Sequence, residues 1–110
     1  MKTNIVQNEV IRIASAICKK LNLTYDEKGS INFYKLRNKN AYHIYFRSIN
    51  VKGSKVLMEV FSNKHNSKKA EVAKNFTLVK TAKELGANLQ IVGGAGSWGI
   101  SVNIFPKKVN

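Results

Sequence analysis

The chain has 110 residues, 19 Lys or Arg against 6 Asp or Glu, and a formal net charge of +13 with a sequence pI near 10.1. Hydrophobic residues make up 44 %, which is enough for one packed core. The composition therefore excludes a disordered basic tail and indicates a single domain over residues 1–110. A single cysteine excludes both a disulfide framework and a metal site built on cysteines.

Targeting segments are not visible in the sequence. The apolar run after Lys2 is interrupted by Asn8, Glu9 and Arg12, so it does not resemble a secretory signal. No stretch approaches the ~20 apolar residues that a membrane helix needs. We therefore expect a soluble, cytoplasmic protein with no membrane partner. We expect Cys18 to be a small buried hydrophobe rather than a reactive thiol.

The first third of the chain predicts a helix followed by a strand. Residues 4–22 form the helix, because apolar side chains recur there at three- and four-residue spacing. Residues 24–29 are polar and turn-like, residues 31–36 predict a strand, and residues 37–40 form an Asn-containing loop.

The clearest strand signal runs from Ala41 to Val51. Its alternation separates two sets of side chains: Tyr42, Ile44 and Phe46 on one face, and His43, Tyr45 and Arg47 on the other. A turn at residues 52–54 and a returning strand at residues 55–61 are expected next.

Ser67 is a suitable N-cap for a second helix that ends near Leu85, with Gly86 as its left-handed terminator. The apolar stripe of this helix is expected to be buried: Val72, Phe76, Val79 and Ala82. Residues 89–92 and 98–105 predict a final hairpin that Pro106 stops. Trp98, Ile100, Val102 and Ile104 alternate along its second strand, with Trp98 expected in the core.

These elements follow the order α-β-β-β-α-β-β. Helices packed on one face of an antiparallel sheet would bury all the apolar stripes together. The sequence therefore predicts an α+β fold with two helices on one face of an antiparallel sheet.

The basic residues are concentrated in the middle of the chain. From Lys28 to Lys83 there are thirteen Lys or Arg and two acids, Glu59 and Glu71, and no acid lies between Lys28 and Met58. A small domain with this excess of positive charge usually has a negatively charged partner. Nucleic acid is the commonest one, because neutralised phosphates release condensed counterions.

Two surfaces are candidates for that contact. The first is the open sheet face at His43, Tyr45 and Arg47, where rings could stack on bases and cations could neutralise phosphates. Tyr34 and Lys35 of the preceding strand would lie nearby. The alternative is an ordinary solvated sheet face.

The second surface is a basic loop and helix start, defined by Lys64, His65, Lys68, Lys69 and Lys74. Backbone N–H groups at a helix start favour anions. The alternative is a solvated charge run. The residues predicted to bind nucleic acid are Arg37, Lys39, His43, Tyr45, Arg47, Lys64, Lys68, Lys69 and Lys74.

The order helix, three strands, helix over residues 4–86 resembles a double-stranded RNA-binding domain. His43 ahead of Phe46, and Ser67-Lys68-Lys69 at the second helix start, are similar to that family. The resemblance implies that the histidine region reaches a minor groove and that the lysines contact phosphates across the major groove. Ala41-Tyr42 stand where the family has Gly-Pro, and the last hairpin falls outside the pattern.

The glycines from Gly94 to Gly99 fit the spacing G-x-G-x-x-G. A dinucleotide site needs a helix after that motif. An alternating strand is expected here instead, so we interpret residues 93–99 as a hairpin connection.

An enzyme is the less favoured class. Glu59 is followed by Val60 and Phe61, so a two-metal nuclease pattern fails. A metal-independent ribonuclease would have to use His43 and His65 as acid and base. A third possibility is a basic accessory or inhibitor protein that docks on an acidic protein surface.

We expect a nucleic-acid-binding protein without catalytic activity, cofactor or metal, with RNA favoured over DNA. The oligomeric state, monomer or homodimer, stays open.

Overall fold

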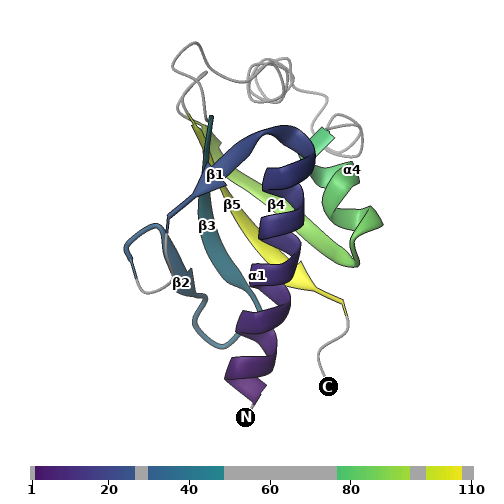
Figure 1. The fold of residues 1–110 in the computed structure, drawn as a ribbon. Helices are drawn as coiled ribbons and strands as arrows, with labels where there is room; N and C mark the ends of the chain where they lie inside the picture. Colours follow the sequence, from purple (N-terminus) through teal and green to yellow (C-terminus); the bar gives the residue numbers. More distant parts are fainter. Residues whose placement is uncertain (1, 27–29, 49–76, 95–98, 108–110) are drawn as a thin grey trace, which may run out of the picture.

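The structure, a computed structural model, describes residues 2–26, 30–48, 77–94 and 99–107. Within these ranges, two helices and five strands follow one another in the order α-β-β-β-α-β-β, which is the predicted order, although the strand at Leu23–Tyr25 was not predicted (Figure 1). Their bounds are Lys2–Leu21 for α1, Leu23–Tyr25 for β1, Phe33–Lys35 for β2, Tyr42–Ser48 for β3, Thr77–Glu84 for α4, Ala87–Gly94 for β4 and Gly99–Pro106 for β5. The predicted α+β fold is confirmed.

The five strands form one antiparallel sheet with β3 at its centre. Along one side of β3, β1 pairs with its second half and β2 with its first half. Along the other side lies β5, and β4 pairs with the far side of β5. The last hairpin of the chain therefore lies directly beside the strand with the strongest sequence signal.

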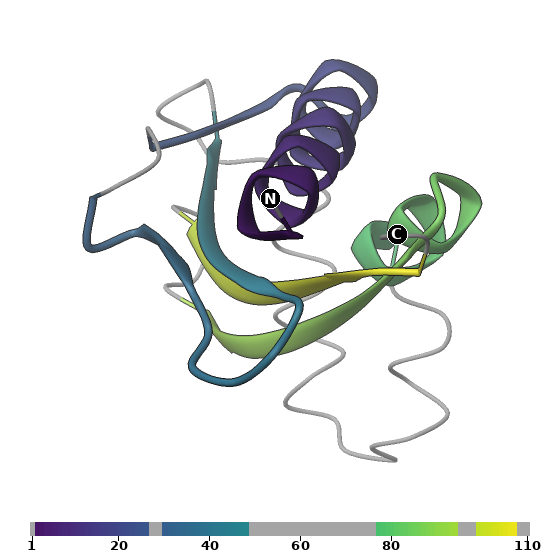
Figure 2. The same cartoon turned by 90° about the horizontal axis from the view of Figure 1, so that it is seen from below.

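Both helices cover the same side of this sheet (Figure 2). The helix α1 packs across β1, β3 and β5, and α4 packs on β4. Between the layers lies one core, whose largest fully buried side chains are Phe33, Phe46, Ile13, Ile17, Ile44, Leu78, Ile100, Ile104, Val6 and Val10. Neither helix of the described ranges is long and apolar enough to cross a bilayer.

Both helices end at a residue with left-handed backbone. Asn22 follows α1 with φ of 59°, and Gly86 follows α4 with φ of 93°. Asn and Gly adopt this conformation at the lowest cost, so each is a natural terminator. Gly86 was predicted in this role.

An arginine joins the two helices at the same place. Arg12 of α1 donates from Nη2 to the carbonyl oxygen of Leu85, over 2.9 Å, at the end of α4. It also donates from Nε to Glu9 Oε1 over 2.6 Å and from Nη2 to Glu9 Oε2 over 3.0 Å. The hydrogen bond lowers the pKa of Glu9 and raises that of Arg12. Helix-end carbonyls favour a cation, so this contact stabilises the α1–α4 packing.

The first strand is the main difference from the sequence prediction. Residues from Thr24 onward were predicted to form a polar turn, but Leu23–Tyr25 pair with β3. Leu23 is buried, and the Tyr25 ring stacks on Phe33 at a centroid distance of 5.8 Å. Three residues contain too little alternation to indicate a strand, so the pairing that creates β1 comes from the rest of the fold.

Several predicted elements lie outside the described residues. They include the strand predicted at residues 55–61, the first half of the second helix with Ser67, Val72 and Phe76, and Trp98. Within the described part of that helix, Ala82 is buried as predicted, but Val79 is only half-buried, and Leu78 and Thr81 are buried instead. β5 ends at Pro106, also as predicted.

Candidate nucleic-acid interface

The alternation predicted for β3 is present. Tyr42, Ile44 and Phe46 are buried beneath the helices, whereas His43 and Tyr45 are half-buried and Arg47 is exposed. A strand directs successive side chains to opposite faces. The three polar and aromatic residues therefore share the face that α1 and α4 leave uncovered, which we call the outer face.

Four side chains form a continuous row across this face, one from each of β2, β3, β5 and β4. The Tyr34 ring stacks on the His43 ring, with centroids 5.0 Å apart and an interplanar angle of 24°. His43 Nδ1 lies 3.0 Å from Asn103 Oδ1, and Asn103 Nδ2 donates to Gln90 Oε1 over 3.2 Å. These four residues face one another in the strand register. We call them the outer row.

The outer row favours one tautomer of His43. With Asn103 Nδ2 donating to Gln90, the Asn103 oxygen faces His43 Nδ1, and the tautomer with its proton on Nδ1 is the one that can donate to it. In the neutral ring, Nε2 is then the acceptor nitrogen. The row therefore supplies an aromatic surface at one end and amide groups at the other.

Tyr45 lies flat against the sheet. A Cβ atom at Gly99 would be 2.5 Å from both Cζ and the hydroxyl oxygen of Tyr45, and 2.7 Å from the carbonyl oxygen of Phe46. The Tyr45 ring thus occupies the space that any side chain at Gly99 would need. Glycine within a strand commonly marks such a close approach. The ring forms part of the sheet surface rather than projecting from it.

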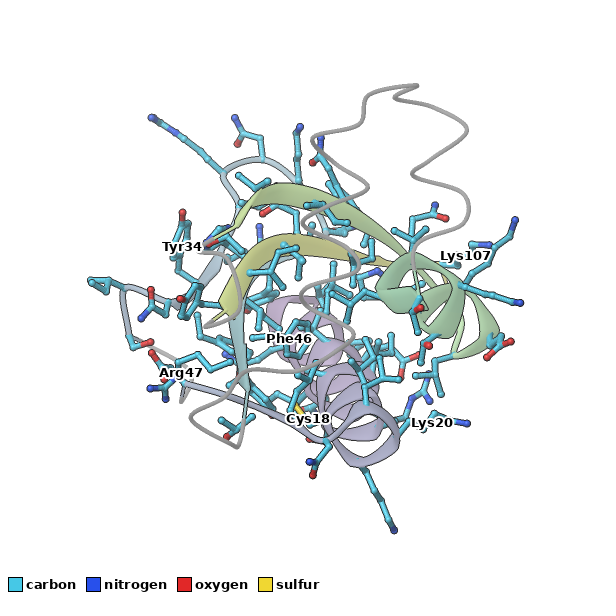
Figure 3. The ribbon with its side chains drawn as sticks, turned by 90° about the horizontal axis from the view of Figure 1, so that it is seen from above. Cys18, Lys20, Tyr34, Phe46, Arg47 and Lys107 are labelled. Atoms are coloured by element: carbon cyan, nitrogen blue, oxygen red, sulfur yellow. The ribbon has the colours of Figure 1, made fainter. Side chains whose placement is uncertain are left out.

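Arg47 is engaged with an acid. Its Nη2 donates to Asp26 Oδ1 over 2.5 Å, and Asn32 Nδ2 donates to Asp26 Oδ2 over 2.6 Å. Asp26 therefore offsets the charge of Arg47. Figure 3 shows Arg47 and Tyr34 on the same side of the molecule.

The turn between β2 and β3 carries cations next to the outer row. Arg37 and Lys39 are exposed there, and Lys35 Nζ donates to the carbonyl oxygen of Lys39 over 3.0 Å. Asn38 has φ of 61°, which lets the chain reverse, and Leu36 N–H donates to the Ala41 carbonyl over 2.9 Å. Figure 2 shows this turn extending to the side of the sheet away from α1. The acids of the described ranges lie elsewhere: Glu9, Asp26 and Glu84.

The second predicted surface is outside the described residues. Lys64, His65, Lys68, Lys69 and Lys74 all fall between residues 49 and 76. Their part in binding stays a prediction. Of the predicted binding residues, the structure thus brings His43, Tyr45 and Arg47 onto one face, with Arg37 and Lys39 in the adjoining turn.

The glycine motif lies between two paired strands. Gly94 closes β4, Gly99 opens β5, and the two strands pair antiparallel with Gly94 opposite Ile100. A strand follows the motif where a dinucleotide site needs a helix. The hairpin interpretation is therefore confirmed for the flanking strands, while residues 95–98 lie outside the described ranges.

Groups with nucleophilic or metal-binding chemistry do not gather in the described part of the chain. Burial raises the pKa of the half-buried Cys18 to about 12, so its thiol stays protonated at neutral pH. No three His, Cys, Asp or Glu among the described residues lie close enough together to hold a metal ion.

Sequence reasoning missed four residues of this face: Asp26, Gln90, Gly99 and Asn103. Asn103 is one of the polar positions that alternate with Ile100, Val102 and Ile104, so its place on the outer face could have been predicted. The hydrogen-bond partners of Asn103 could not be predicted, because they depend on which strand lies beside β5 and in which register.

Comparisons with family models, with curated proteins and with solved structures find no match.

Proposed function

We propose that this protein binds nucleic acid through the outer face and the β2–β3 turn, without catalysing a reaction. One observation carries the proposal: an ordered row of aromatic and amide side chains lies directly beside an exposed turn with two cations, in a chain of net charge +13. Nucleic acid presents both kinds of partner for such a surface, since phosphates attract cations and bases stack on rings.

The outer face supplies groups for sugar and base contacts. Tyr34, His43 and Tyr45 offer ring surfaces, and Asn103 and Gln90 offer amide groups. Rings and amides of this kind stack on unpaired bases and hydrogen-bond their edges.

The turn supplies the electrostatic part. Arg37 and Lys39 are exposed, and neither makes an ion pair with another residue of the described ranges. Exposed cations without a local acid can neutralise phosphates at little desolvation cost. The basic residues predicted between Lys64 and Lys74 would add further phosphate contacts.

Binding should be measured by fluorescence anisotropy with matched single- and double-stranded RNA and DNA across a salt series. The decisive variant is Arg37→Gln/Lys39→Gln. If both cations contact phosphates, the slope of log K against log salt becomes shallower by about 1.4 for single strands and about 1.8 for duplex DNA.

The matched control is Lys19→Gln/Lys20→Gln, which removes the same charge from the exposed end of α1. Figure 3 shows Lys20 on the opposite side of the molecule from Tyr34. We expect the control to leave the slope nearly unchanged. Equal changes in both variants would mean that net charge alone governs binding and would contradict this placement of the interface.

A ribonuclease is the second candidate, favoured by the hydrogen bond between His43 and Asn103 on the outer face. In the tautomer that donates from Nδ1 to Asn103, Nε2 is the nitrogen available for proton transfer. Its expected partner, His65, lies outside the described residues. A gel of each binding mixture tests this candidate: cleavage that His43→Gln abolishes would replace the binding-only proposal. Absence of any oligonucleotide binding near physiological salt would instead direct attention to an acidic protein partner.

A further inference from the structure

We infer that the outer face contains a stacking site for an unpaired base, with Tyr34 as the stacking ring, and that the protein therefore prefers single-stranded to duplex nucleic acid. This inference rests on the proposed function and names the substrate class of the same surface.

The Tyr34 ring has one covered face and one open side. His43 stacks against it at a centroid distance of 5.0 Å, yet Tyr34 remains 47 % exposed. Because His43 covers one face, the exposed area comes from the other face and the ring edge. Figure 3 shows Tyr34 projecting outward at the β2 side of the sheet. A flat ring with a free face is the surface on which a nucleobase stacks.

The ring pair is held before any ligand arrives. His43 is fixed by Asn103, which is in turn fixed by Gln90, so the ring beneath Tyr34 belongs to a four-strand network. Side chains that are already ordered lose less conformational entropy on binding. The stacking site is therefore better prepared for a base than an isolated surface tyrosine would be.

The cations lie where the phosphates of such a base would be. Arg37 and Lys39 belong to the turn that follows β2, three and five residues after Tyr34. A base on Tyr34 would bring its own backbone toward these residues. Bases inside a duplex are paired and stacked on one another, so their faces are not available to a protein ring without unstacking. The arrangement thus fits a single strand.

The test compares two oligomers of equal length and charge: oligothymidine and an abasic deoxyribose oligomer that lacks bases. We expect wild-type protein to bind oligothymidine more tightly. We expect Tyr34→Thr to lower the affinity for oligothymidine about tenfold, because one stacked base is lost. The affinity for the abasic oligomer should stay unchanged. Tyr34→Phe, which keeps the ring, should retain the wild-type preference.

Two controls isolate the ring. Ile31→Thr removes an apolar side chain that is 88 % exposed in the segment before β2, and it should not change the preference. The salt slope of Tyr34→Thr should equal that of wild type, because no charge is removed. Circular dichroism and thermal unfolding of each variant establish that the fold is intact.

The outcomes separate the two claims. If wild-type protein shows salt-dependent binding but treats the two oligomers alike, or if Tyr34→Thr binds oligothymidine as wild type does, the stacking site is refuted and the proposed function stands. Tighter binding of duplex than of single strands would likewise refute the stacking site and leave the proposed function standing. If no nucleic acid binds near physiological salt, both the proposed function and this inference fail.

Discussion

Replacing Gly99 with alanine should destabilise the protein, although glycine-to-alanine changes in regular structure usually do the reverse. Alanine restricts the unfolded chain more than glycine and by itself adds about 0.4–1 kcal/mol of stability where the backbone tolerates it. At Gly99 the added Cβ would lie 2.5 Å from two atoms of Tyr45 and 2.7 Å from the carbonyl oxygen of Phe46. The free-energy cost of this clash therefore determines whether Gly99→Ala stabilises or destabilises the protein.

The two clashes differ in how they can be relieved. The Tyr45 ring can turn away, at the loss of its packing on β5. The Phe46 oxygen belongs to the backbone of β3, which pairs directly with β5, so the strands themselves must shift. Overpacking of this kind typically costs about 1–3 kcal/mol. Each kcal/mol lowers the Tm by roughly 4–8 °C in a domain of this size.

Urea unfolding monitored by circular dichroism measures the effect, and Gly93→Ala is the matched control. Gly93 lies on the neighbouring strand β4, where an added Cβ meets nothing within 4 Å. We expect Gly93→Ala to be neutral or stabilising. A Gly99→Ala protein as stable as wild type would refute the close packing of Tyr45 on Gly99.

The Tyr45 contribution can be separated by a double-mutant cycle. In a Tyr45→Ala background the ring clash is absent and only the Phe46 oxygen remains in the way. Gly99→Ala should then cost less, and a coupling energy of at least about 0.5 kcal/mol is expected for residues in direct contact. Additive effects would show that the backbone contact alone carries the penalty.

Two further predictions concern ionisable groups. Glu9 has a lowered pKa through its hydrogen bond with Arg12, so its contribution to stability is complete above the unfolded value of 4.5 and is lost as the pH falls through the folded value. Urea unfolding at pH 7 should show Glu9→Gln less stable than wild type by no more than about 0.5 kcal/mol, because the pair is accessible to solvent, and the difference should shrink as the pH falls below 4.5. Cys18, whose pKa burial raises to about 12, should react slowly with iodoacetamide at pH 8 and rapidly once urea unfolds the chain; equal rates would contradict its burial.

The sequence was informative wherever a local pattern determines the structure. The period of α1, the alternation of β3 and β5, and the terminators Gly86 and Pro106 were all predicted, because each depends on neighbours a few residues away. These features define the buried side of the sheet and the class of the fold.

The rest depended on pairing between distant segments. β1 is a strand only because β3 offers hydrogen-bonding partners to Leu23–Tyr25. The ion pair between Asp26 and Arg47 follows from that pairing, and it changes the expected role of Arg47. A loop acid and a strand cation that are 21 residues apart give no local signal of contact.

The outer row and the core depend on the same register. His43 and Asn103 are 60 residues apart, yet they face each other because Ile44 faces Val102 in the buried layer below. Slipping β5 by one residue would turn Asn103 into the core and expose the apolar residues beside it, at a large loss of buried surface. The packing of Ile44 and Val102 therefore fixes the geometry of the polar face above them.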